Sequence, residues 1–236
     1  MATKARKRPA LILSARRSTW NTDPTEGRTE LERVAPQVHK RDKGTCLFCG
    51  FQSVKYQELH HVNHDHTNHA PENLATICSM CHMTFHIGRA GLLGEAELVW
   101  LPEMPQQMLN HTARAIFIAM AGDGDEKMGA ESLYSALRVR ADDARRRIGT
   151  SDPADLGEAM LALDNDSYRR RAETLNGIRL LPLGRKIVDD KDIFPEMLKY
   201  WTSPKGPFAK VPPKRWGGMF DHIRRQNQKA EQAKSA

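Results

Sequence analysis

Four cysteines stand in two C-x-x-C pairs, Cys46/Cys49 and Cys78/Cys81, and the 236-residue chain contains no other cysteine. Each pair can present two thiolates to one tetrahedral Zn²⁺, and the two pairs together make a shell of four sulfurs. Such a closed shell leaves no coordination position for a substrate, so this zinc is expected to be structural. A redox C-x-x-C motif is the main competing interpretation, but it does not explain two pairs with histidines between them.

Seven of the ten histidines lie between His60 and His86, inside or directly beside this cysteine frame. Neutral imidazoles bind divalent cations, and they can also take a proton from water near neutral pH. Hydrolysis of a phosphodiester needs both functions, because a cation must stabilise the leaving oxygen while a base activates the water. For His64, His66 and His69 the simpler interpretation is that they are ordinary loop residues.

The order of these residues resembles that of the HNH nucleases, which have a ββα-metal fold. The segments that carry the resemblance are Glu58-Leu59-His60-His61, then Pro71-Glu72-Asn73-Leu74, then Cys78-x2-Cys81-His82-x3-His86. It covers about residues 40–87 and implies a metal-dependent endonuclease that acts on DNA.

The resemblance also implies a role for each matching residue. His61 would be the general base, and Asn73 would hold that base or its loop. His60, His82 and His86 would bind a second divalent cation, which could be Mg²⁺, Mn²⁺, Ni²⁺ or Zn²⁺. Asp65 or His64 could contribute a ligand instead, and the sequence does not decide between these sets.

A longer stretch, about residues 11–120, is similar to the IcmJ/DotN family of type IV-B secretion systems, which are related to conjugation systems. The shared segments are Cys49-Gly50-Phe51-Gln52, the turn at residues 71–76 and Leu101-Pro102-Glu103-Met104. The resemblance implies a zinc-holding adaptor attached to the coupling ATPase complex, with an eroded nuclease motif. This chain departs from that pattern, because it retains the motif histidines and Asn73.

Two functions are therefore expected. The favoured one is an HNH-type endonuclease that hydrolyses DNA phosphodiesters, in conjugative transfer or type IV secretion. The alternative is a catalytically silent zinc-binding adaptor of a type IV-B coupling complex, which docks partners through its helical half. A third interpretation is a nucleic-acid-binding zinc module without catalysis.

Net charge and composition indicate which partners and which cellular location fit these functions. The net charge of +7 and pI of about 9.3 favour a phosphate-rich partner such as DNA. Arginine runs at residues 138–147 and 169–171 could contact phosphates, or could form a solvated face paired with Asp and Glu. No apolar stretch approaches the ~20 residues that span a bilayer. We expect a bacterial cytoplasmic protein, and the IcmJ/DotN resemblance adds a position peripheral to a secretion complex at the inner membrane.

The expected fold class is α+β, with a small zinc-stapled ββα-metal unit and a mainly helical C-terminal region. We expect a basic arm and short strand at 1–28, the zinc-knuckle domain at 29–104, a mainly helical region at 105–202 and a Pro/Gly-rich, disordered basic tail at 203–236. Leu11–Leu13 is the predicted short strand, and Gly88–Gly94 is predicted as a glycine-bearing loop. Aromatic residues between 200 and 220 could pack back on the core or present a partner-binding edge.

Overall fold

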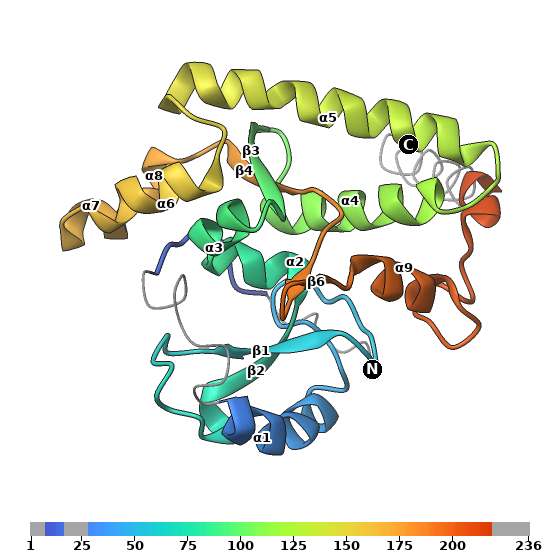
Figure 1. Cartoon of the computed structure of the whole chain (residues 1–236), viewed down its shortest axis with the longest axis horizontal. Helices are drawn as coiled ribbons and strands as arrows, with labels where there is room; N and C mark the ends of the chain where they lie inside the picture. The colour runs from blue at the N-terminus through green and yellow to red at the C-terminus, as the bar shows by residue number, and fades with distance from the viewer. Residues whose placement is uncertain (1–7, 17–27, 219–236) are drawn as a thin grey trace, which may run out of the picture.

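The computed structural model describes residues 8–16 and 28–218 (Figure 1). Its lower part is a β-hairpin with one helix beneath it and a short helix after it. The elements are α1 (Arg28–Arg41), β1 (Gln57–His61), β2 (Leu74–Cys78) and α2 (Ser79–His82). β1 and β2 are antiparallel, with Gln57 opposite Cys78 and His61 opposite Leu74. The hairpin therefore carries the histidine pair on one strand and delivers a cysteine at the end of the other.

The upper part is mainly helical. It is built from α4 (Gln106–Met120), α5 (Glu126–Ile148), α6 (Pro153–Leu161), α7 (Asn165–Arg169), α8 (Arg171–Thr174) and α9 (Phe194–Thr202). Figure 1 shows α4 and α5 running side by side, with β3 (Ala96–Trp100) and β4 (Ile178–Pro182) near one end of α4. These two strands pair antiparallel across a long stretch of sequence. Helices and small antiparallel sheets thus confirm the α+β class.

Turn and cap chemistry explains several element boundaries. Asp152 caps α6 by accepting a hydrogen bond from the Ala154 N–H, and Pro153 occupies the first helical position. The glycine-rich linker after Met120 separates α4 from α5. Pro36 lies inside α1 without ending the helix. Two short helices, α7 and α8, follow α6.

Two local predictions are wrong. Leu11–Leu13 forms no strand, although Ser14, next to it, exchanges backbone hydrogen bonds with Thr84 and Ile87. Residues 88–94 are mostly helical, because α3 (Ile87–Leu92) packs closely against α6. A Cβ at Gly91 would lie 2.3 Å from the Ala154 nitrogen, so this glycine permits the close approach of the two helices.

The C-terminal part of the described chain covers the first knuckle. Phe208 stacks on Phe51 with ring centroids 6.2 Å apart, and its N–H donates to the Trp201 carbonyl. Residues 203–218 therefore return to the core. This agrees with the prediction that aromatic residues between 200 and 220 pack back on the core, and it differs from the prediction of a disordered tail that begins at residue 203. The prediction for 219–236, like that for the basic arm at 1–7, lies outside the described residues, and so do residues 17–27.

Candidate metal centre

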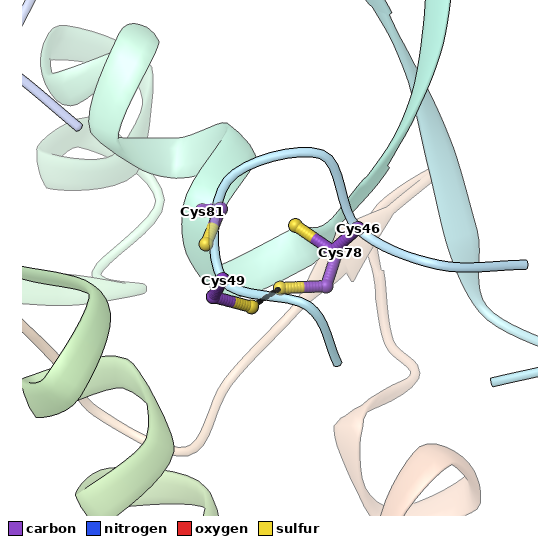
Figure 2. A group of neighbouring side chains, drawn as sticks. All are labelled: Cys46, Cys49, Cys78 and Cys81. Carbon is purple, nitrogen blue, oxygen red and sulfur yellow. Dashed lines mark hydrogen bonds between the residues drawn. The ribbon is translucent and has the colours of Figure 1, made fainter. Parts of the chain in front are cut away.

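The four cysteines meet at one buried point between the two parts of the fold. Their sulfurs all lie within 4.8 Å of one another and face a common centre (Figure 2). Cys49 Sγ is 3.7 Å from Cys78 Sγ. A tetrahedron with zinc–sulfur bonds of about 2.3 Å has edges of about 3.8 Å, so the arrangement fits a four-thiolate zinc site.

Local structure explains how each pair is presented. In the first knuckle the Cys46 N–H donates to the Phe51 carbonyl, and Gly50 closes the turn at a φ of +79°. That left-handed conformation favours glycine. In the second knuckle, Cys78 ends β2 and Cys81 lies one turn later in α2. Spacing of three residues therefore brings both thiols of each pair to the same side.

The thiols perturb one another strongly because they lie so close together. Hydrogen bonding with Cys46 lowers the pKa of Cys49, and the same neighbour raises the pKa of Cys81. Four buried thiols this close together cannot all lose their protons unless a cation balances the charge. A divalent ion would replace the shared protons and allow all four sulfurs to act as ligands.

The histidines of β1 are buried on both sides of the strand. His60 is 3% exposed and packs between the rings of Phe48 and Phe85. His61 stacks on His66 with ring centroids 4.5 Å apart, and its Nε2 lies 3.1 Å from Nδ1 of His69. Burial lowers the pKa of His60 to about 3 and that of His61 to about 4. Both imidazoles are therefore neutral at pH 7.

His82 and His86 come together at the far end of the knuckle. Their Nε2 atoms are 3.2 Å apart, although a 3₁₀ turn (Met83–Phe85) separates them instead of one continuous helix. The ring of His60 lies 5.9 Å from the ring of His82, centroid to centroid. In the described part of the chain, the three expected ligand histidines do not form a group with all their donor atoms within 4.8 Å.

Asn73 holds the loop that carries the other histidines. Its Oδ1 accepts from the Asn63 N–H, and its Nδ2 donates to the Asn68 carbonyl. Asn73 was expected to hold either His61 or the loop beside it, and these two contacts are with the loop. The loop includes His64, at a φ of +62°, and His66, whose ring is 5.6 Å from that of His86.

With this geometry in view, comparison with known proteins identifies the family. No protein-family model matches the chain. The type 4 apparatus protein DotN of Legionella pneumophila is 34% identical to it over 150 residues, which cover 62% of this chain and 70% of that protein. The chain belongs to the DotN family. The IcmJ/DotN resemblance is thus confirmed.

This member of the DotN family has a charged pair behind the histidines that the sequence did not reveal. Glu58 Oε2 lies 2.6 Å from Nδ1 of His82, and Glu58 Oε1 lies 2.9 Å from Nζ of Lys186. Burial opposes ionisation, but the charge of Lys186 and the hydrogen bond from His82 hold the pKa of Glu58 well below its usual range. Glu58 shares a face of β1 with His60, since residues two apart on a strand point the same way. The spacing of Glu58 and His60 in the sequence could therefore have indicated that Glu58 lies beside the histidines. No sequence pattern around Lys186 indicates its contact with Glu58.

Two small cavities flank the histidines of the DotN-family chain. One of ≈ 250 Å³ is lined by Glu58, Lys186, His66, His82 and His86 among others, and one of ≈ 340 Å³ by His60, His64, Arg16 and Arg171 among others. Water and small anions therefore have room beside the imidazoles. None of the helices in residues 8–16 and 28–218 is both long enough and apolar enough to cross a membrane.

Proposed function

We propose that this chain is a zinc-stabilised structural subunit of a bacterial type 4 apparatus and docks partner subunits of that machine. The observation that carries the proposal is its similarity to DotN, a type 4 apparatus protein, over most of that protein's length. The closed sulfur shell adds support, because a four-cysteine zinc holds a fold together and offers no position for substrate. The coupling ATPase complex, at the inner membrane, is the partner that the IcmJ/DotN resemblance implies.

The arginine runs agree better with a structural subunit than with a dedicated DNA-binding face. Their described side chains are mostly engaged within the chain. Ion pairs join Arg138 to Glu97, Arg140 to Glu103, Arg145 to Asp142, Arg146 to Asp143 and Arg169 to Asp166. Arg147 lies over the ring of Trp100. Exposed pairs of this kind are weak and do not prevent contact with phosphate, but they reduce the local excess of positive charge.

Co-purification with the coupling ATPase of its own apparatus tests this function. The full chain should co-purify with the ATPase complex, and the His61→Ala and His82→Ala variants should do so equally well. Cys46→Ser, which removes a zinc ligand, should lose the interaction because the knuckle unfolds. If the folded wild-type chain associates with no apparatus component in cells or in vitro, the proposal is wrong.

A second candidate function is the metal-dependent hydrolysis of DNA phosphodiesters. It is favoured by one specific arrangement, in which the Nε2 atoms of His82 and His86 face each other while Glu58 orients His82 from behind. Metal-binding histidines characteristically donate their other ring N–H to a carboxylate in this way. A neutral His61 on the adjacent strand could then serve as the general base, with the cation at His82, His86 and His60.

Plasmid DNA separates the two candidates. Wild type, His61→Ala and His39→Ala should be compared with Mg²⁺, Mn²⁺, Ni²⁺ or Zn²⁺ and with EDTA. His39 is the matched control, because it contacts Thr76 outside the cluster. Cleavage that requires metal and His61 supports the nuclease, and cleavage that survives His61→Ala refutes the assignment of the base. Absence of cleavage under every condition leaves the structural subunit, and DNA binding without cleavage supports a non-catalytic nucleic-acid module.

A further inference from the structure

Arg114 is a buried cation that has no carboxylate partner within residues 8–16 and 28–218. Its side chain lies in the middle of α4 and is 1% exposed. Among the residues that the structure describes, it takes part in none of the ion pairs with Asp or Glu, and its Nε has no hydrogen-bond partner. Removing an isolated charge from water is costly, so a buried guanidinium requires compensating negative charge nearby.

The nearest groups that can supply this negative charge are the cysteines. Arg114 Nη2 lies 3.3 Å from Cys78 Sγ and is positioned to donate to it. The guanidinium also lies 3.9 Å from the centre of the Phe51 ring and 5.6 Å from that of Trp201. Aromatic faces attract a cation but do not neutralise it. Four thiolates around a divalent ion retain a net charge of −2, and the positive charge of Arg114 offsets half of it.

His111 is a histidine beside Arg114, and its contacts show which of the two side chains acts as the counter-charge. Arg114 Nη1 can only donate, so Nδ1 of His111, 3.3 Å away, must accept. The proton is then on Nε2 of His111, which donates to the Cys49 carbonyl at 2.9 Å. Hydrogen bonding with Cys49 raises the pKa of His111, but a proton on its Nδ1 would face an N–H of Arg114, so Arg114 is the permanent cation of the cluster.

Asn110 supplies a second donor one helical turn earlier. It is 0% exposed, and its Nδ2 lies 3.3 Å from Cys81 Sγ and 3.0 Å from the Met80 carbonyl. Gln106, one further turn back, bonds to Asn110 Oδ1 and to both backbone groups of Leu180 in β4. Residues four apart share one face of a helix, so a single row on α4 connects β4 to both sulfurs of the second knuckle.

We propose that Arg114 is the internal counter-charge of the zinc centre and that Arg114 and Asn110 together hold Cys78 and Cys81 as metal-binding thiolates. α4 lies outside the cysteine-bearing segment, so the helical region contributes directly to zinc retention. Both are positioning residues that act through the cysteines. The inference holds for a structural subunit and for a nuclease alike, because it concerns only the four-sulfur site.

Zinc release from the full-length, zinc-loaded chain tests the inference. Transfer of zinc to an excess of a chromogenic chelator should be about 10- to 100-fold faster from Arg114→Gln than from wild type, the range typical for loss of a group that supports a metal ligand. Arg114→Lys keeps the charge and should fall between the two. Arg140→Gln removes an arginine paired with exposed Glu103 and should release zinc at the wild-type rate.

Cobalt(II) substitution adds a readout that a packing defect alone would not move. Loss of an N–H donor leaves more electron density on the sulfur, so the sulfur-to-cobalt charge-transfer band should shift to lower energy in Arg114→Gln. Equal release rates from Lys and Gln variants with an unshifted band would overturn the counter-charge. If Arg114→Gln does not fold, Asn110→Ala is the second variant. It removes the donor to Cys81, together with the bonds to the Met80 carbonyl and to Gln106, and keeps Arg114 in place. Release and spectrum identical to wild type in that variant would also overturn the proposal.

Discussion

Nδ1 of His82 donates a hydrogen bond of 2.6 Å to Oε2 of Glu58. An ionised carboxylate can only accept, so Nδ1 of His82 is the donor, and Nε2 of His82 lies 3.2 Å from Nε2 of His86. The arrangement therefore fixes the orientation of the His82 ring. It does so with an acid that is itself anchored by Lys186, from the loop after β4.

The second candidate function, metal-dependent hydrolysis, predicts that a further divalent ion binds at this position in addition to zinc. Zinc-loaded protein titrated with Co²⁺ or Ni²⁺ should take up one further ion, and His82→Ala should abolish that uptake. Glu58→Gln should weaken it about 10- to 100-fold, because the amide no longer fixes the tautomer. Calorimetric titration gives both stoichiometry and affinity, with His39→Ala as control. Uptake that persists in His82→Ala would place the ion elsewhere.

Removal of one cysteine should unfold the knuckle. Zinc binding at such sites contributes on the order of 10 kcal/mol, which is comparable to the whole stability of a domain. Cys46→Ser should therefore lack stoichiometric zinc, and the amides of β1 and β2 should lose their protection in hydrogen exchange. Met128→Ser, at a position that is 76% exposed, should keep both properties. Full zinc content in Cys46→Ser would show that this thiol is not a ligand.

The four-cysteine site could be predicted from the sequence, whereas the contact of Glu58 with Lys186 could not. The cysteine spacing determines the zinc site locally, since each pair spans a single turn. Asp152 and Pro153 determine the start of α6 in the same way. The contact of Glu58 with Lys186 depends instead on β3 pairing with β4, which no local pattern reveals.

The helix at residues 87–92 likewise depends on tertiary contacts that the local sequence does not reveal. Gly88 and Gly91 disfavour a helix in isolation, and the predicted glycine-bearing loop followed that preference. Packing against α6 reverses the balance, because the small residues let the two helices approach closely. Tertiary contacts therefore override a propensity of about 1 kcal/mol per glycine.

Buried His60 should make stability fall in acid. Its folded pKa of about 3 lies below the ordinary 6.5, so the unfolded chain binds the proton first as the pH falls. Stability supplied by the neutral ring is complete above pH 6.5 and is lost as the pH falls from there towards 3, at up to about 1.4 kcal/mol per pH unit. His60→Phe, which suits the contacts with Phe48 and Phe85, should lack that part of the slope. Urea unfolding at several pH values measures it in zinc-loaded protein.

Zinc is also lost in acid, so the decisive quantity is the difference between wild type and His60→Phe. The two slopes should diverge below pH 6.5 and coincide between pH 7 and 8, where the imidazole is neutral in both the folded and the unfolded chain. Parallel slopes throughout would mean that His60 is protonated in the folded state or exposed to solvent.

The seam between β3 and β4 should be sensitive to a single methyl group at Gly177. This residue has a φ of +90°, and a Cβ there would lie 2.3 Å from the ring of Trp100. Gly177→Ala should therefore lower the free energy of unfolding by about 2 kcal/mol or more, from left-handed strain and overpacking together. Gly129→Ala is the matched control, because it lies within α5 with no atom within 4 Å of the added carbon, and it should raise stability by about 0.5–1 kcal/mol. Urea midpoints that move in the same direction for both variants would contradict the close approach of Gly177 to Trp100.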